Sequence, residues 1–434
     1  MKKHFIFAAA ATMLTACVNL DTLNGVDDYQ APNSIGFSTF TTHQTKAENS
    51  TEDATSSLSN FNTTFLVWGY KTINNTPAYV FGKTSGDTPT YPGQLVQYSN
   101  PSWTYSPIRG WDKSASQYDF YAAAPSTASW VWDETNNALA LNNFVITGTN
   151  AVSTVGTENT ASEAISVDSE DLMISTNKTV APAQYGTAVQ LDFNHILSRL
   201  NIGIQKGSEV YDYTVKLNSI KIFNLINKAS FDEDADLTNV IPAYGNNTDE
   251  GHDTRAYILS HGVAARWTKS TVATDKFTTG QMQYVNAEGL EITSSEAIPT
   301  HDPAVTSSYQ YVFKGLVIPQ TSAFAQTKLP TDNTYNETTD LNIDGSNRDD
   351  LGLPYIEIDF EIGTTVGSTY TKGDGFKYYY NLADVFNGDG TGAFTFCEGW
   401  QNTLLITLKP DVIEFTPLVY NWEDKDVMIE VVKD

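Results

Sequence analysis

Cys17 is the residue whose position most clearly predicts a chemical modification. It follows residues 1–16, a segment of the 434-residue chain with two lysines near its start and then an apolar run too short to span a bilayer. Leu14-Thr15-Ala16-Cys17 matches the bacterial lipobox. This match predicts cleavage before Cys17 and attachment of acyl chains such as palmitate to its thiol and amine. Because several acyl chains hold a protein firmly, we expect a lipid anchor in the outer membrane, with an ordinary secretory signal as the alternative.

No other group of residues has the spacing that catalysis or metal binding requires. The sequence contains no P-loop, nucleophile elbow or dinucleotide-binding fingerprint, and none of its six histidines pairs with another at metal-ligand spacing. His195 lies in an apolar row and is expected to be a core histidine bonded to backbone. Cys397 is expected to be a small core residue, so no disulfide is predicted. We therefore expect neither enzymatic activity nor a metal or cofactor.

Acidic residues leave minor alternatives open. Asp384–Gly390 resembles a calcium loop but carries the extra residue Phe386, so a hairpin turn at Asn387–Gly390 is the preferred interpretation. The acidic residues within Phe231–Asn247 are expected to form a solvated loop, with a calcium site as the alternative. A pair of carboxylates facing a cleft, as in a glycoside hydrolase, also stays open because nothing singles out or excludes a pair.

The composition indicates an acidic, all-β protein. The formal net charge is −26 at pH 7, which repels a phosphate backbone, so nucleic acid is not an expected partner. Hydrophobic residues make up 40% and aromatic residues 12% of the chain, enough to bury large cores. Much of the remaining polarity is Thr, Ser and Asn, and Thr and aromatic residues suit half-buried strands. The length favours two or three domains.

The elements that position these residues are expected to be strands organised around Val189–Gln205. Apolar residues alternate in two runs within this stretch, and the parity changes near Ser198-Arg199. A strand buries every second side chain, so the change predicts a bulge or a bend between two strands. A helix would fit part of the stretch, but Gly203 and the β-branched residues favour strands.

Further short strands are expected on both sides of this stretch, separated by clusters of Gly, Pro, Asn and Asp. In Tyr355–Ile362 the acidic residues alternate with apolar ones, which predicts one buried and one wet face. His43–Asn60 and Ala151–Glu170 are expected to be loops. The other expected strands are Ser34–Thr41, Phe65–Tyr70, Ala78–Phe81, Gln94–Tyr98, Trp103–Tyr105, Gln117–Pro125, Tyr213–Leu225, Arg255–Leu259, Tyr309–Pro319, Phe376–Leu382, Thr403–Leu408 and Val427–Val432.

Several of these blocks, in their order and spacing, resemble the fimbrillin (type V pilin) family of surface lipoproteins. The resemblance implies an all-β chain with two tandem transthyretin-like antiparallel β-sandwich domains. Residues 1–16 would be the signal peptide, 17–60 a tether with a possible first strand, 61–184 the first domain and 185–434 the second. The matching residues are Trp103, Tyr105, Pro107, Trp111, Tyr118–Ala122, Pro125, Asp171–Met173, Val189–Leu200, Gly399, Trp400, Thr403–Leu408, Ile413–Phe415, Val419 and Trp422.

The resemblance further implies a structural or adhesive subunit of a cell-surface fimbria, in a stalk, tip or anchor position. Subunits of the family assemble by strand exchange, in which a protease removes the first strand and a partner's strand replaces it. Family stalk subunits are cut after an arginine, whereas the first arginine here is Arg109, so Lys46 is the only basic processing site in the tether. Val427, Ile429 and Val431 would form a donor strand, or would close the chain's own sheet. Other fimbrial subunits and a surface receptor are the implied partners.

A second function stays open beside this one. Trp103, Trp111, Trp130 and Trp132 could stack on sugars if they are exposed. The alternative is therefore a non-polymerising, glycan-binding surface lipoprotein, and it depends on the exposure of these four side chains.

Overall fold

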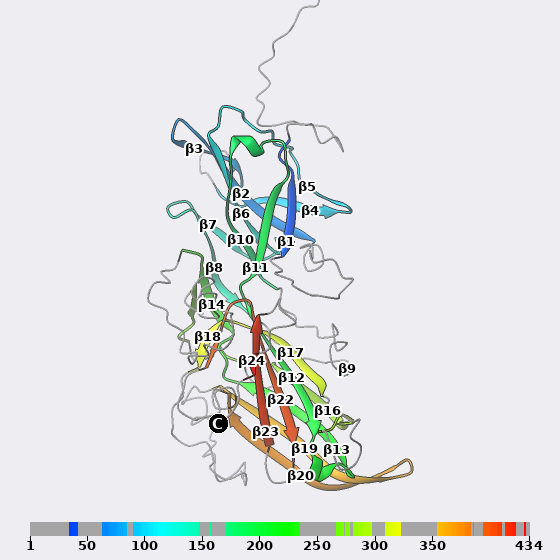
Figure 1. The fold of residues 1–434 in the computed structure, drawn as a ribbon. Coiled ribbons are helices and arrows are strands. Elements are labelled where there is room, and N and C mark those ends of the chain that lie inside the picture. Colours follow the sequence, from blue (N-terminus) through cyan, green and yellow to red (C-terminus); the bar gives the residue numbers. More distant parts are fainter. Residues whose placement is uncertain are drawn as a thin grey trace, which may run out of the picture.

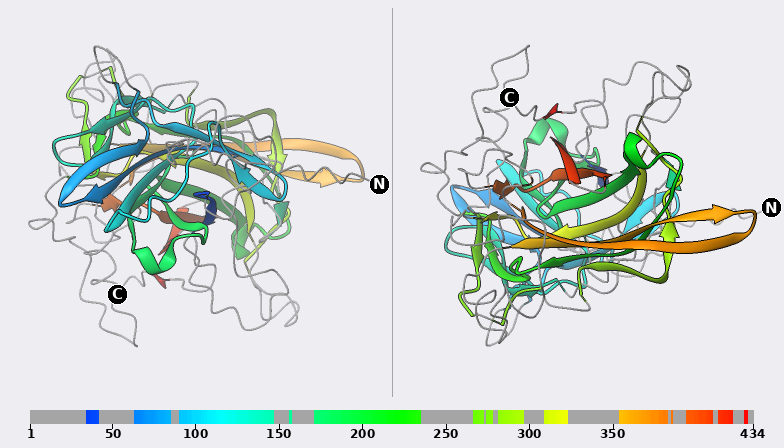
Figure 2. Two further views of the ribbon diagram at one scale, coloured as in Figure 1. Left: turned by 90° about the horizontal axis from the view of Figure 1, so that it is seen from above. Right: turned by 90° about the horizontal axis from the view of Figure 1, so that it is seen from below.

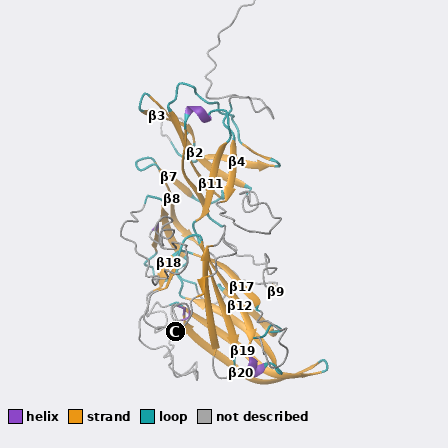
Figure 3. Ribbon diagram, viewed as in Figure 1, coloured by secondary structure: helices purple, strands orange, loops and turns teal. Residues whose placement is uncertain are grey.

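The described part of the chain is built almost entirely from β-strands, which confirms the all-β prediction (Figure 3). Short 3-10 turns lie at Pro182–Gln184 and Ser208–Val210. Within the described ranges, no helix is long and apolar enough to cross a membrane. The computed structural model describes residues 34–41, 63–84, 90–146, 156–157, 171–234, 266–272, 274–277, 281–296, 309–322, 354–382, 385, 394–409, 413–421 and 429–430.

The first half of the molecule is one eight-stranded sheet, in the order β1-β11-β10-β6-β2-β4-β5 with β3 paired to β2 (Figure 1). All pairs in it are antiparallel except that of β1 with β11, which is parallel. Its strands are β1 (Phe37–Thr41), β2 (Thr64–Ile73), β3 (Thr76–Phe81), β4 (Gln94–Ser99), β5 (Ser102–Thr104), β6 (Gln117–Ala124), β10 (Met173–Val180) and β11 (Val189–His195).

The second half is built mainly from two sheets that cover one core (Figures 1 and 2). One has the order β24-β23-β22-β12-β17-β9 and contains the second parallel pair, β12 with β22. The other has the order β16-β13-β19-β20. The strands are β9 (Gly156–Thr157), β12 (Ser198–Lys206), β13 (Thr214–Phe223), β16 (Gln283–Glu291), β17 (Gln310–Val317), β19 (Tyr355–Val366), β20 (Thr369–Asn381), β22 (Trp400–Leu408), β23 (Ile413–Asn421) and β24 (Ile429–Glu430), with a small pair of β18 (Gln320–Ser322) and β21 (Phe394–Phe396).

A further sheet joins the two halves. Its order is β15-β14-β8-β7, so a hairpin from the first half pairs with strands from the second. Its strands are β7 (Trp130–Asp133), β8 (Ala138–Val145), β14 (Lys228–Asp232) and β15 (Trp267–Lys269). β11 belongs to the first sheet although it follows residue 184, and the division into domains at 184/185 stays a prediction.

The stretch Val189–Gln205 forms two strands with a bend between them, as predicted. β11 ends at His195 and β12 begins at Ser198, and the two strands belong to different sheets. Residues along β11 are alternately buried and more exposed, because every second side chain enters the core of the first half. His195 is buried in the core, as expected, and its Nδ1 lies 2.8 Å from Oδ2 of Asp171, a carboxylate neighbour that the sequence did not indicate.

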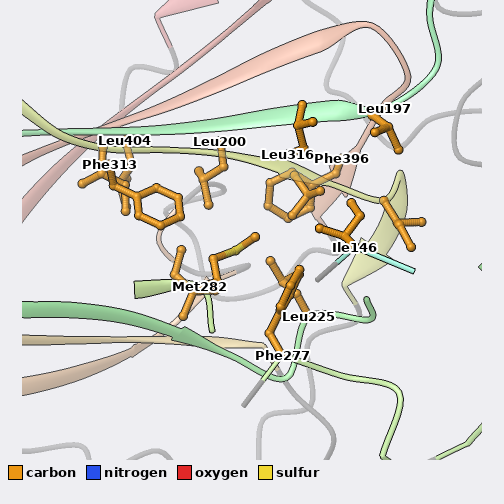
Figure 4. Packing of buried hydrophobic residues seen from close by; sticks show 14 of the residues in the cluster. Ile146, Leu197, Leu200, Leu225, Phe277, Met282, Phe313, Leu316, Phe396 and Leu404 are labelled. Atoms are coloured by element: carbon orange, nitrogen blue, oxygen red, sulfur yellow. The ribbon is translucent and has the colours of Figure 1, made fainter. Parts of the chain in front are cut away.

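Apolar side chains from the two facing sheets of the second half meet in a common core (Figure 4). Leu200, Phe313 and Leu404 come from β12, β17 and β22 on one side. Phe277 and Met282 lie opposite them and are also buried. This core continues through Trp132 to Trp68 of the first half, whose rings stack with centroids 6.1 Å apart.

The prediction that the acidic side chains of β19 face solvent is wrong for two of them. Glu357 and Glu361 are buried, because basic and hydroxyl groups of neighbouring strands cover them. Nζ of Lys221 lies 2.6 Å from Glu357, and Tyr370 donates to Glu361 at 2.9 Å. A cross-strand ion pair and a cross-strand hydrogen bond therefore take the place of water on this part of the sheet.

Candidate functional site

The first strand, β1, is an edge strand of the first sheet. It pairs in parallel with β11, from Phe37 opposite Val189 to Thr41 opposite Phe193. The N–H of Val189 also donates to the carbonyl of Gly36 at 2.8 Å. The sheet order ends at β1, so within the described residues the other side of this strand has no strand partner. A single ladder of backbone hydrogen bonds therefore holds β1 in its sheet, and directly before β1 Ser34 forms an isolated antiparallel bridge with Gly110.

The inward side of β1 inserts a row of side chains into the core of the first half. Ile35 is 1% exposed, Phe37 is 7% exposed and Thr39 is 5% exposed. The Phe37 ring is surrounded by four aromatic rings, which we call the β1 seat. They are Phe65, Phe81, Tyr105 and Phe120, with ring centroids 6.1, 5.6, 5.6 and 6.0 Å from that of Phe37.

The seat is assembled from four separate segments. Phe65 lies on β2, Phe81 ends β3, Tyr105 follows β5 and Phe120 lies on β6. Gly69 lets β2 and β6 approach, because a Cβ at this position would lie 2.9 Å from the Phe120 ring. These aromatic side chains alternate with others that face away, so their strands place them on one surface.

Hydrogen bonds from the loop after β5 fix the start of the first strand. The Tyr105 hydroxyl donates to the carbonyl of Ile35 at 2.6 Å, and the Ile35 N–H donates to the carbonyl of Arg109 at 2.8 Å. The Arg109 N–H in turn donates to the Tyr105 oxygen at 3.2 Å. Burial raises the pKa of Tyr105 to about 12, so its hydroxyl keeps its proton at neutral pH and remains a donor.

The structure places only one of the residues predicted for lipidation, processing or strand donation. Cys17, Lys46, Val427 and Val431 lie outside the described residues. Ile429 begins β24, which pairs with β23 through two residue pairs, Val419 with Ile429 and Leu418 with Glu430. β24 and β1 are edges of different sheets, so the fold does not bring them together within one chain.

The four tryptophans of the glycan alternative are buried, so the stacking surface predicted from them is wrong. Trp103 is 5%, Trp111 4%, Trp130 8% and Trp132 5% exposed. Their rings fill the cores, as the stacking of Trp132 on Trp68 illustrates. A buried indole offers no face to a sugar.

Metal binding gains no support from the described residues. They contain no group of three or more His, Cys, Asp or Glu side chains placed to hold an ion. Within the acidic segment, Glu233 is engaged in the shared sheet and accepts the N–H of Leu139 at 2.9 Å. The rest of that segment beyond residue 234, and all of Asp384–Gly390 except Val385, lie outside the described residues. Cys397 is buried, as predicted, and forms no disulfide within the described residues.

The sequence interpretation located the strands of the seat but missed the seat itself. Ile35, Phe37 and Thr39 occupy alternate positions, and this alternation was the available signal for an inserted row. The four seat residues lie 28 to 83 positions from Phe37 along the chain. Local periodicity gives the facing direction of a side chain but not its distant neighbours, so only the fold reveals that they converge.

Comparisons with known proteins find similarity at the level of solved structures. No family model matches the chain, and a search of curated proteins finds no match. A fimbrial protein from Bacteroides vulgatus ATCC 8482 is similar with a TM-score of 0.42 and 14% identity, over 90% of this chain and 99% of that one. The tip fimbrial protein Mfa3 from Porphyromonas gingivalis is similar with a TM-score of 0.31 and 11% identity, over 83% of this chain and 94% of that one. Both TM-scores lie below 0.5, so neither likeness assigns a function to this chain.

Proposed function

We propose that this chain is a structural or adhesive subunit of a cell-surface fimbria, joined to its neighbours by exchange of the strand in the β1 seat. The observation that carries the proposal is the row of Ile35, Phe37 and Thr39, which an edge strand inserts into an aromatic core. A core that depends on an edge strand can accept the same row from another chain. This is recognition by strand addition, in which backbone bonds give affinity and alternate side chains give specificity.

The energetics favour a long-lived complex once the seat is filled from outside. Loss of β1 would expose the seat and the free edge of β11, and burying one Phe side chain is worth about 1.5–3 kcal/mol. The buried Thr39 Oγ1 makes no hydrogen bond in the described structure. The C-terminal row of Val427, Ile429 and Val431 is wholly aliphatic, so it would fill the position of Thr39 without an unpaired hydroxyl.

Exchange is expected to be directly measurable after cleavage near Lys46. A protease site inserted after Lys46 would cut β1 from the folded chain and leave it seated without a covalent link. We expect a peptide of residues 425–434 to displace the excised segment, as followed by native mass spectrometry. At a peptide concentration of about 100 times its Kd, the chain should be about 2.7 kcal/mol more stable than the same chain with an empty seat.

The matched control is the same peptide with Ile429→Asp, which would bring a charge into the aromatic seat and should not displace β1. Failure of the unmodified peptide to bind the cut chain would contradict the donor assignment. Identification of the amino-terminal peptide by mass spectrometry, in protein from shed surface filaments, then reports the natural state. A start at Cys17 indicates an intact lipoprotein in an anchor or tip position, and a start after Lys46 indicates strand removal.

Truncation after Trp422 is expected to abolish multimers and to leave the monomer folded. β24 adds only two residue pairs to the edge of its sheet, so its loss costs the monomer little. Size-exclusion chromatography with light scattering would measure the multimers, and circular dichroism would measure the fold. A truncated chain that no longer folds would show that the segment completes its own sheet, which would count against donation.

Lipid anchoring through Cys17 is expected to retain the protein in the outer membrane fraction. Cys17→Ala should move the protein to a soluble fraction. In cells fed an alkynyl palmitate analogue, the variant protein should carry no label. Cys397→Ala is the matched control, because this second thiol is buried and should leave labelling unchanged. Palmitate label that persists in Cys17→Ala would rule out this residue as the anchor.

A further inference from the structure

The two strands β11 and β12 form one line of backbone along the elongated molecule (Figure 1). β11 lies in the first half and β12 in the second, and only two residues, Ile196 and Leu197, separate them. Each strand has one parallel neighbour. β1 lies along β11 over five residue pairs, and β22 lies along β12 over eight, from Arg199 with Gln401 to Lys206 with Leu408.

The bend in this line is held by hydrogen bonds from both halves. The Ile196 N–H donates to the carbonyl of Leu172 at 3.0 Å, and the Trp267 indole N–H donates to the carbonyl of Ile196 at 2.9 Å. The N–H of Gly399 donates to the carbonyl of Leu197 at 2.9 Å. These groups are largely buried, so water does not compete for the bonds.

The direction of the strands decides how they respond to a stretching force. The ladder of a parallel pair has evenly spaced bonds, and a force along the strands that pulls opposite ends loads all of them together. A force that pulls the same ends apart loads one pair at a time. Each bond adds only about 1 kcal/mol net, so simultaneous loading is what makes a ladder strong.

We propose that β11 and β12, with their parallel neighbours β1 and β22, are a tension-bearing column that carries force through the chain. A pull on the segment that occupies the β1 seat, away from the second half, slides that segment along β11. A pull on the far end of β22 slides β22 along β12. The backbone of β11 and β12 connects the two ladders, and the bonds at the bend keep it from straightening. β23 strengthens the column because it pairs with β22 over nine residue pairs.

Pulling single molecules from chosen points tests this column in the monomer. Cysteine handles at Thr187 and Glu414, both exposed, pull the start of β11 against the hairpin that ends β22. This geometry loads the eight pairs of β12 and β22 in shear. Handles at Glu209 and Glu414 pull from the shared end of the same two strands and peel them apart. Both variants carry Cys17→Ser, and Cys397 stays buried.

We expect the rupture force of the Thr187–Glu414 molecules to be several-fold higher than that of the Glu209–Glu414 molecules at the same loading rate. The two variants share the handle at Glu414. The Glu209 variant also loses the ion pair of Glu209 with Lys409, but Glu209 is exposed, so this pair adds little to the stability of the fold. Equal rupture forces would overturn the column. The measurement uses one chain, so its outcome is independent of whether the protein polymerises.

Discussion

Phe37→Ala is expected to lower the free energy of unfolding by about 3–5 kcal/mol, the usual cost of removing a fully packed phenylalanine. The ring is 7% exposed and touches aromatic rings from four different segments. Its removal leaves a cavity at the centre of the seat. The four surrounding rings are held by separate segments, so they cannot move together to fill it. Urea unfolding followed by tryptophan fluorescence measures the loss, because Trp103 lies next to Phe65 of the seat.

Ser38→Ala is the matched control for this variant, because Ser38 neighbours Phe37 on the same strand but faces away from the seat. Its effect should stay within about 0.5 kcal/mol, as for most substitutions outside the core. Phe37→Leu keeps most of the apolar volume and should fall between the two. A Phe37→Ala loss as small as that of Ser38→Ala would show that the first strand adds little to the core.

Arg266→Ala is the second large effect expected, at about 3–5 kcal/mol at pH 8, because it leaves a buried carboxylate without its counter-charge. Nε of Arg266 lies 2.9 Å from Oε2 of Glu398, whose side chain is 2% exposed. The pair lies beside the bend between β11 and β12, since Gly399 bonds to Leu197. Thermal or urea unfolding in matched buffers measures the loss.

The effect of Arg266→Ala should be clearly smaller at pH 5. Burial raises the pKa of Glu398 to about 7, against its ordinary value of 4.5, although the nearby Arg266 acts in the opposite direction. Because the folded chain holds the proton of Glu398 more tightly than the unfolded chain does, this proton stabilises the fold fully below pH 4.5. That stabilisation, up to about 3 kcal/mol, is lost as the pH rises through 7. The wild-type chain should therefore lose stability from pH 5 to pH 8. At pH 5 Glu398 is largely neutral, so Arg266→Ala leaves no buried carboxylate without a counter-charge at this pH.

Lys83→Ala provides the comparison for a surface ion pair. Its partner Glu134 lies 3.7 Å away, and the side chains are 32% and 54% exposed. Water screens this pair, so the loss should be small and nearly the same at both pH values. An Arg266→Ala effect that does not change between pH 5 and pH 8 would contradict the raised pKa of Glu398.

Strand positions were largely readable from the sequence, because alternation reports directly which side chains a sheet buries. β2, β6, β12 and β19 lie where the pattern placed them, each with small differences at the ends. β7, β8, β14, β15 and β16 are not among the expected strands. Trp130–Asp133 is short, and two adjacent asparagines, Asn142 and Asn143, interrupt the alternation in Ala138–Val145, so neither gives a clear period. Their pairing depends on neighbours from the other half of the chain, which no local pattern contains.

Features that depend on pairing between distant parts of the chain could not be predicted from the sequence. The parallel pairing of β1 with β11 joins residues about 150 positions apart, and that of β12 with β22 joins residues about 200 apart. The acidic residues of β19 were expected in water, but burial of Glu357 and Glu361 follows from lysine and tyrosine side chains on adjacent strands. The same limit explains why the sequence did not reveal Asp171 as a neighbour of His195.

The sheet shared between the halves has a consequence for how the polypeptide can be divided. The β7–β8 hairpin is synthesised well before β14 and β15, yet β8 has β14 as its neighbour on one side. If the first half folds before the rest of the chain follows, it therefore has an open hairpin edge that stays unpaired until residues 228–232 arrive. Neither half contains all the strands of this sheet. A chimaera that replaces one half by that of a relative must therefore take both the β7–β8 hairpin and the strands β14 and β15 from the same protein.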